Sequence, residues 1–318
     1  MIRKFIAGLA LAAATLAPGF TPSAQAESYP ERPITIVIPF AAGGDTDVIG
    51  RLMAAEMSKK LGQVVAVQNV VGANGMNGMN AVATAKPDGY TLGFCPPAPM
   101  TIHPYLRKLP YSMESFTIIG RAYNAPCFLV VPSKSSWKNI NDMLAFIKNS
   151  PTKFFWASSG TGSVPHLGIL SFFKAFKVAT GNHIGFNGDA DAFQALAGDR
   201  AQLYLSTAAN IGTYEVKPLV LLGEKRHPAY PDTPTAKELG NDVEVSLYGT
   251  LFAPKGTPDY IVSIISEAMK TACASPEYMN ALERLGLESA YLGPDKALTF
   301  IREEATRNQE LIRSLSEK

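Results

Sequence analysis

The most constraining feature of the sequence is an apolar strand at residues 34–38 that runs through a glycine turn directly into a helix. The strand is mostly β-branched, the turn contains Pro39, Gly43 and Gly44, and helical periodicity starts near Thr46. The first backbone N–H groups of a helix have no partner within it, so they point outward and favour a bound anion. Glycine lets a ligand approach the backbone closely, because it has no Cβ. We therefore expect a small carboxylate or another oxyanion here, held mainly by main-chain donors.

Residues 1–26 have the pattern of a cleavable secretory signal peptide. Arg3 and Lys4 precede an apolar run, helix breakers follow it, and Ala24-Gln25-Ala26 provides a small-residue cleavage motif. The apolar run is short for a bilayer span, and no Cys follows the cleavage region to carry a lipid anchor. These features predict a soluble protein that is exported after cleavage of the signal.

The charge balance argues against several classes of partner. The chain has 29 Lys and Arg against 27 Asp and Glu, and loss of the signal peptide removes two basic residues and leaves 27 of each. Nucleic-acid binding needs a concentrated basic face, and docking to anionic lipid needs a polybasic segment. We expect neither partner.

The cysteines and histidines show no metal-ligand spacing. Cys95, Cys127 and Cys273 lie far apart, and the four His residues form no motif with them. We expect no metal and no cofactor. The pattern leaves open one disulfide with one free thiol, or three buried thiols.

The mature chain is long enough for two domains, since 318 residues less 26 leaves 292. Strands are predicted at residues 34–38, 64–67, 91–94, 127–131, 154–157, 202–205, 218–222 and 246–253. Helices are predicted at residues 47–61, 76–85, 141–150, 163–177, 190–196, 259–274, 276–285 and 294–315. This alternation favours parallel sheets flanked by helices, which bind ligands beyond the carboxyl ends of their strands.

A second strand-to-helix turn, at residues 156–167, repeats the chemistry of the first. A short apolar strand ends at Ala157, small hydroxyl and glycine residues follow, Ser163 is a natural N-cap, and Pro165 suits the first helical turn. If each turn belongs to one lobe, the two turns face each other across a cleft and hold a small anion from both sides. The simpler interpretation is two ordinary capped loops.

Several motifs together resemble the solute-binding proteins of tripartite tricarboxylate transporters, the Bug or TctC-like receptors. The similarity covers nearly the whole mature chain and rests on the following segments: Tyr29-Pro30-Glu31-Arg32-Pro33-Ile34; Pro39-Phe40-Ala41-Ala42-Gly43-Gly44-Asp45-Thr46-Asp47 with Arg51; Gln68-Asn69 to Gly78; Pro87-Asp88-Gly89-Tyr90-Thr91-Leu92; Ser158-Ser159-Gly160 to His166-Leu167; Pro231-Asp232-Thr233-Pro234-Thr235; and Phe252-Ala253-Pro254-Lys255-Gly256-Thr257-Pro258.

The resemblance implies an α/β fold of the two-lobed, type II-like periplasmic binding protein class, with parallel or mixed sheets flanked by helices and a hinged central cleft. Lobe 1 would comprise residues 27–124 and 246–318, and lobe 2 residues 125–245. The resemblance also implies a monomer that binds a small carboxylate and delivers it to a membrane permease, without catalysis.

The resemblance places the carboxylate grip on the two turns, partly through ordered water. The residues concerned are Phe40, Ala42, Gly43, Gly44 and Asp45 in the first turn, and Ser158, Ser159, Gly160, Thr161, Gly162 and Ser163 in the second. We add His166, Asn187, Gly188 and Thr207 as candidate ligand-binding residues.

The chain departs from the family pattern in lobe 2. Phe186-Asn187-Gly188 stands where the family commonly has Tyr-Lys-Gly, and Ser206 stands where it often has Asp. Loss of both charges points to a guest other than an amino acid, and dicarboxylates, aromatic acids and nicotinate-like acids stay open.

Other side chains near the turns have structural interpretations. Asp47 is expected to cap its helix, Arg51 to form an ion pair, and Asp189 to act as an N-cap. For His166, ligand contact and packing are both open.

Two alternative functions draw on the same residues. Ser163, His166 and Asp189 can be drawn as a hydrolase triad, but the sequence has no G-x-S-x-G motif. A ligand-sensing component of a signalling system would use the same binding chemistry as an uptake receptor.

Overall fold

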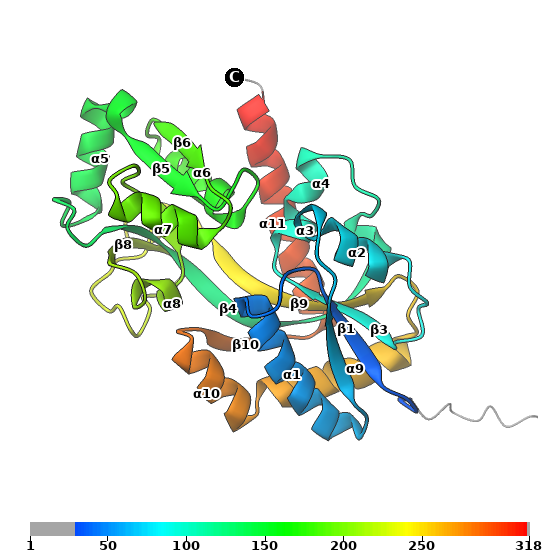
Figure 1. The fold of residues 1–318 in the computed structure, drawn as a ribbon. Coiled ribbons are helices and arrows are strands. Elements are labelled where there is room, and N and C mark those ends of the chain that lie inside the picture. Colours follow the sequence, from blue (N-terminus) through cyan, green and yellow to red (C-terminus); the bar gives the residue numbers. More distant parts are fainter. Residues whose placement is uncertain (1–28, 317–318) are drawn as a thin grey trace, which may run out of the picture.

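A computed structural model describes residues 29–316 of the chain (Figure 1). The expected signal peptide at residues 1–26 lies outside the described residues. Within the described part, no helix combines the length and the apolar character needed to cross a membrane.

The first half of the described chain contains β1 (Ile34–Ile38), α1 (Asp45–Leu61), β2 (Val65–Asn69), η1 (Ala73–Gly75), α2 (Met76–Ala83), β3 (Thr91–Cys95), α3 (Ala98–Thr101), α4 (His103–Leu106), η2 (Met113–Ser115), β4 (Phe116–Pro132), α5 (Ile140–Asn149), η3 (Pro151–Lys153) and β5 (Phe155–Ser158). The second half contains α6 (Val164–Phe176), β6 (Asn182–Gly185), α7 (Asp189–Ala197), β7 (Tyr204–Ser206), α8 (Ala208–Ile211), β8 (Val216–Leu222), β9 (Ser246–Pro254), α9 (Asp259–Cys273), α10 (Pro276–Arg284), β10 (Glu288–Leu292) and α11 (Pro294–Ser316).

The main sheet is mixed, with the order β10-β4-β9-β3-β1-β2. β1 pairs in parallel with β2 and β3, as the strand–helix alternation predicts. β9 is antiparallel to β3 and β4, and β10 is antiparallel to β4, so this part of the sheet is not parallel. The antiparallel pairs arise because β9 follows the long segment at residues 133–245 and returns to the sheet from the opposite direction.

Strand β1 is buried on both of its faces, which explains its continuous apolar run. Alternate side chains point to opposite sides of a strand. Ile36 and Ile38 belong to a hydrophobic cluster with α1 and α9, whereas Val37 belongs to another with Met79 of α2 and Ile301 of α11. The sheet is therefore covered by helices on both faces.

Strand β4 is 17 residues long and joins two parts of the molecule. Its first part pairs with β9 from Phe116 to Pro126, and its last part pairs with β7 and β8 from Cys127 to Pro132. Figure 1 shows β4 and β9 passing together between the part with α1 and α9 and the part with α5 to α8. The boundaries expected at residues 124/125 and 245/246 fall at this crossing, and the division itself stays a prediction.

Helix α11 packs against both parts. Near its beginning, Ala297 and Ile301 are buried in the cluster that contains Val37. Near its end, Leu311 is buried in the cluster that contains Leu167 and Leu170 of α6. The last helix is therefore common to two cores.

Strands β6 and β10 were not predicted from the sequence, and the predicted N-cap of α7 was wrong. β6 has half-buried and exposed residues, and β10 is an exposed edge strand, so neither has the apolar pattern of a buried strand. Asp189 is not an N-cap: Gly188 occupies that position, and the Asp189 carboxylate instead accepts a hydrogen bond from the Tyr204 hydroxyl at 2.5 Å.

All three cysteines are buried and free. Burial raises the pKa of Cys127 and Cys273 to about 12 and also raises that of Cys95. Because the thiolate is the reactive form, we expect the native protein to resist a maleimide and the urea-unfolded protein to react at three thiols. Labelling followed by intact mass measurement tests this, and a count of one thiol after unfolding would reveal a disulfide instead.

Candidate functional site

The first turn has the conformation that an anion site requires. Gly44 is the N-cap of α1, and Gly43 has φ +85°, which a residue with a Cβ adopts only with strain. Within the described residues, the N–H groups of Gly44, Asp45 and Thr46 donate to no protein acceptor. These donors remain available to a guest.

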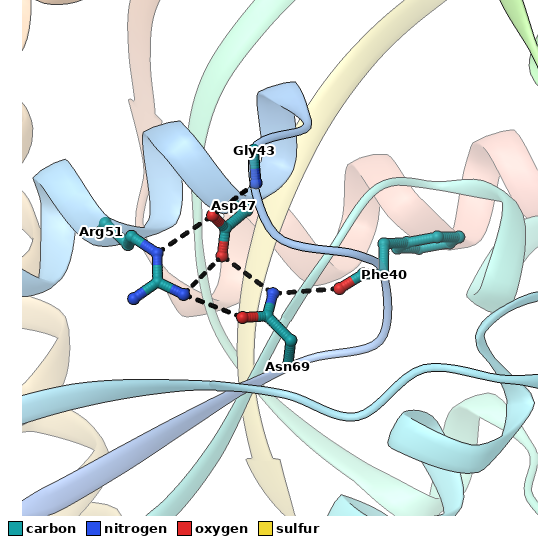
Figure 2. Close-up of polar contacts among 5 residues, drawn as sticks. All are labelled: Phe40, Gly43, Asp47, Arg51 and Asn69. Atoms are coloured by element: carbon teal, nitrogen blue, oxygen red, sulfur yellow. Dashed lines mark hydrogen bonds and ion pairs between the residues drawn. The ribbon is translucent and has the colours of Figure 1, made fainter.

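A buried carboxylate holds this turn in place (Figure 2). Asp47, only 3% exposed, accepts hydrogen bonds from Arg51 Nε at 3.0 Å, from the Gly43 N–H at 2.9 Å and from Asn69 Nδ2 at 2.8 Å. Asn69 Nδ2 also donates to the Phe40 carbonyl oxygen at 3.0 Å. The Arg51 hydrogen bond, followed by those from Gly43 and Asn69, lowers the pKa of Asp47 to about 2. Asp47 therefore anchors the turn, and Arg51 forms the ion pair expected from the sequence.

The second turn is built around Ser163. Its side chain accepts a hydrogen bond from the His166 N–H at 3.2 Å, which confirms the predicted N-cap of α6, and Pro165 lies in the first helical turn. Gly160 and Gly162 have φ values of +113° and +82°. The N–H groups of Gly160, Gly162 and Ser163 donate within the turn, whereas those of Thr161 and Val164 have no acceptor among the described residues and remain available at a second helix start.

Trp156 and two histidines form a stacked cluster behind this turn. The Trp156 ring lies 5.7 Å from that of His166 and 4.4 Å from that of His183 between centroids. His183 Nε2 and Ser158 Oγ are 2.7 Å apart, and the Gly162 N–H donates to His166 Nδ1 at 3.4 Å. Burial, followed by the nearby His183, lowers the pKa of His166 to about 4. The imidazole is therefore a neutral support for the turn.

The hydrolase alternative has no matching geometry. Ser163 Oγ accepts from the main-chain N–H of His166, and Asp189 is hydrogen-bonded to Tyr204. Among residues 29–316, the Ser163 hydroxyl makes no hydrogen bond to the His166 ring. These three side chains do not form a relay.

A cavity of about 590 Å³ lies between the two turns. Nine of the predicted site residues line it: Phe40, Gly44, Asp45, Ser159, Gly160, Thr161, Ser163, Gly188 and Thr207. The other six do not contribute to its lining: Ala42, Gly43, Ser158, Gly162, His166 and Asn187. Of these six, Gly43, Ser158, Gly162 and His166 make hydrogen bonds within the turns, so they shape the cavity from behind.

Sequence reasoning missed the rest of the lining. Pro96, Ala98 and His103 follow β3, and the rule that ligands lie beyond the ends of parallel strands was a usable signal for them. Tyr123 and Leu247 lie within β4 and β9, where no loop motif marks them. The remaining lining residues outside the prediction are Ala41, Thr46, Asp47, Asn74, Ala125, Cys127, Val164, Pro165, Asp189, Leu205, Ser206, Asn210 and Leu287.

The lining has an unusual charge distribution. It contains Asp45, Asp47 and Asp189, while no Lys or Arg within the described residues contributes to it. Because Asp47 is paired with Arg51, the remaining local charges are the partial positive charges of the helix starts and the carboxylates of Asp45 and Asp189.

Comparison with known proteins identifies the family. Residues 49–316 match the tripartite tricarboxylate transporter family receptor, TctC. A protein of Cupriavidus necator described as "UPF0065 protein in gbd 5'region" is 34% identical, and the alignment covers 98% of this chain and 97% of that protein.

Solved structures agree with this assignment. A TctC solute-binding protein from Polaromonas, without ligand, gives a TM-score of 0.79 at 29% identity, covering 90% of this chain and 99% of that one. MatC from Rhodopseudomonas palustris, with bound malate, gives 0.73 at 29% identity, covering 89% and 100%. Another R. palustris protein, with adipate, gives 0.77 at 26% identity, covering 90% and 97%. The fold is therefore the mixed α/β, two-lobed fold of periplasmic binding proteins, and these relatives are solute-binding receptors rather than enzymes. The chain belongs to the TctC family of periplasmic solute-binding receptors.

Proposed function

We propose that this protein captures a small carboxylate in the cavity between its two turns and delivers it to the membrane permease of a tripartite tricarboxylate transporter. The observation that carries this proposal is the pair of helix starts, at α1 and α6, whose N–H groups border one cavity. The relatives with bound malate and adipate support a carboxylate guest.

Main-chain donors would supply the binding energy for the carboxylate. An anion at a helix start gains about 0.3–1 kcal/mol from the dipole at an exposed site and up to about 2 kcal/mol where it is partly buried. Charge-assisted hydrogen bonds from the N–H groups add to this. The cavity volume lies within the range usual for small-molecule sites.

Closure of the two lobes would present the loaded state to the permease. We place lobe 1 at residues 27–124 and 246–318 and lobe 2 at residues 125–245. The crossing of β4 and β9 would then be the hinge, with the first turn on lobe 1 and the second on lobe 2. A guest that touches both turns favours the closed state, and the population shifts by no more than the difference in its affinity for the two states.

A pair of glycine variants tests the binding site. Gly43 has φ +85° and Gly256 has φ +86°, and a Cβ at either position would meet nothing within 4 Å. Valine should strain both loops to a similar degree. Only Gly43→Val displaces the donors beside the cavity, so we expect it to lose carboxylate binding at least about tenfold while Gly256→Val keeps it.

The measurement is a thermal-shift screen of dicarboxylates, tricarboxylates, aromatic acids and nicotinate, because a ligand that binds the native state raises the unfolding midpoint. Calorimetry on the best acid then compares the two variants. Equal affinity in Gly43→Val and the wild type would exclude the first turn from the site.

Deletion experiments in cells distinguish delivery of the acid from sensing of the acid. Loss of uptake of the labelled acid on deletion of the permease supports transport. Unchanged uptake with loss of gene induction on deletion of the receptor supports sensing. Sedimentation of the purified protein with and without the acid tests the expected monomer.

A further inference from the structure

Helix α11 carries a glutamate that contacts the crossing of the two long strands. The Glu304 carboxyl group accepts a hydrogen bond from the Tyr248 hydroxyl of β9. Tyr248 pairs with Asn124 of β4, at the boundary where we place the hinge. The Glu304 side chain therefore joins the last helix to the point about which the two lobes would turn.

Two further contacts attach α11 near this point. Asn308, one turn after Glu304, donates from Nδ2 to Thr101 Oγ1 of α3 at 3.4 Å. Phe300, one turn before Glu304, packs against the Arg121 guanidinium of β4, with 4.6 Å between the ring centroid and Arg121 Cζ. Residues four apart share one face of a helix. That face of α11 is therefore attached to β4, β9 and α3.

A second cavity, of about 350 Å³, lies beside Glu304. Its walls come from α11, including Glu304 and Leu311, from α6, and from residues 242–245. Val164, at the start of α6, lines both this second cavity and the guest cavity. Because the walls belong to both of the lobes that we place, movement of the lobes would change the width of the second cavity and the access of water to Glu304.

Glu304 has no ion pair among the described residues, and its side chain is partly buried. The guanidinium of Arg121 is occupied, since it packs on Phe300 and donates from Nε to the Ala290 carbonyl oxygen at 3.3 Å. The other charged side chains around the second cavity are Lys174 of α6, Asp242 and Glu244 before β9, and Arg307 and Glu310 of α11. Since an unpaired carboxylate is unfavourable away from water, this position favours the neutral carboxyl.

The immediate neighbours of Glu304 also suit the protonated form. Thr101 Oγ1 lies beside the carboxyl and already donates to the Pro97 carbonyl oxygen at 3.1 Å, so toward Glu304 it is an acceptor. An acceptor matches the O–H of a neutral carboxyl. Burial raises the pKa of Glu304 from 4.5 to about 7, against the hydrogen bond from Tyr248 and the positive charge of Arg307. The carboxyl therefore changes its charge near neutral pH.

We propose that Glu304 is a proton-controlled switch for the hinge. Neutral Glu304 keeps α11 on the crossing strands. Ionised Glu304 requires water, which reaches it when the end of α11 moves away from α6 and the second cavity widens. A guest that favours the closed state would then take up protons as it binds near neutral pH. The effect on affinity rests on the proposed function, whereas the loosening of α11 in the empty protein does not.

Hydrogen exchange of the empty protein tests the switch at α11. Mass spectrometry measures amide protection at residues 309–315 at pH 6.0 and pH 8.5, corrected for the pH dependence of intrinsic exchange, with α9 as the internal reference. We expect protection in the wild type to fall at least about threefold at the higher pH. Glu304→Gln stays neutral and still offers Tyr248 an acceptor, so it should show equal protection at both pH values.

Glu303→Gln is the matched control, because Glu303 is an exposed neighbour that lines neither cavity. It should behave as the wild type does. If protection in the wild type is the same at both pH values, the inference is wrong. It is also wrong if Glu304→Gln loses as much protection as the wild type.

Calorimetry with malate, adipate and the best acid of the screen measures the consequence for the guest. The pKa of Glu304 limits the change in affinity between pH 6.0 and pH 8.5 to about tenfold. We expect the affinity of the wild type and of Glu303→Gln to fall about three- to tenfold over this range, and that of Glu304→Gln to stay nearly constant. At pH 7, heats measured in buffers of different ionisation enthalpy should show proton uptake by the wild type.

The outcomes separate this inference from the proposed function. Affinity that rises with pH, or proton release on binding, would contradict the switch while carboxylate binding stands. If no acid binds, the proposed function fails, and hydrogen exchange still decides whether Glu304 controls α11. If Glu304→Gln does not fold, the exchange and proton uptake of the wild type decide the inference.

Discussion

Replacing Asp47 with Ala should lower the free energy of unfolding at pH 7 by about 3 kcal/mol, because it removes the acceptor for three donors at a side chain that is only 3% exposed. The Gly43 N–H and the Asn69 amide would lose their partner, and Arg51 would lose its ion pair. Urea unfolding followed by circular dichroism measures the change. We also expect loss of carboxylate binding, since the turn that carries the free N–H groups is no longer held.

The same variant has a pH signature. The pKa of Asp47 falls from 3.8 to about 2 on folding. A lowered carboxyl pKa contributes stability that is complete above pH 3.8 and is lost as the pH falls toward 2. The wild type should therefore lose more stability between pH 4 and pH 2 than Asp47→Ala does. Asp191→Ala is the control, and an acid dependence in Asp47→Ala as steep as in the wild type would contradict this role.

Replacing Trp156 with Ala should cost about 3–5 kcal/mol of stability, the range for loss of a buried aromatic ring. Trp156 is 1% exposed, contacts Phe173 edge-on, and donates from Nε1 to the Thr180 carbonyl at 2.6 Å. Without this ring, water reaches His166, so its pKa should rise from about 4 toward 6.5. Urea unfolding and an NMR titration of the histidines measure both effects.

Trp156→Phe is the milder variant to use if Trp156→Ala does not fold. The second Trp of the chain provides a control. Trp137 is 8% exposed and packs against Phe146 and Phe154, and it does not line the cavity. Trp137→Phe should lower stability without changing ligand affinity, whereas Trp156→Phe should lower both because the second turn lies on Trp156. Equal affinity in the two variants would show that the stacked cluster does not support the turn.

The longer helices and most strands were predictable because their signals are local, whereas the four-residue helices α3, α4 and α8 were not predicted. Ser163 capped its helix as its residue type indicates, and Ile34–Ile38 is a buried strand as its apolar run indicates. Only residues 127–131 of β4 were recognised, because Gly120, Asn124 and Pro126 interrupt the apolar pattern in its first part. Pairing with β9 and β10 overrides that weak local preference.

The residues of the candidate site also divide into those that have a local sequence signal and those that do not. Gly44 and Gly160 were found because a glycine turn before a helix is visible in the sequence. Tyr123 and Leu247 reach the cavity on crossing strands, and His103 arrives on a separate short helix, so only the assembled fold brings them there. The sequence predicts Asp189 as an N-cap, but its carboxylate accepts from Tyr204, because sequence alone does not say which way an acidic residue at a helix start points.

Helix α11 packs into a hydrophobic core at each of its ends, which would limit how far the two halves of the cavity can separate. Ile301 is held among the strands and helices of one core, and Leu311 is held against α6 in the other. Helix α11 has a fixed length. Separation of the two halves would therefore either slide the last turns of α11 along α6 or detach them from α6. In the closure that we propose, the carboxyl-terminal helix would therefore restrain the two halves and contribute to the energy difference between the empty and loaded shapes of the receptor.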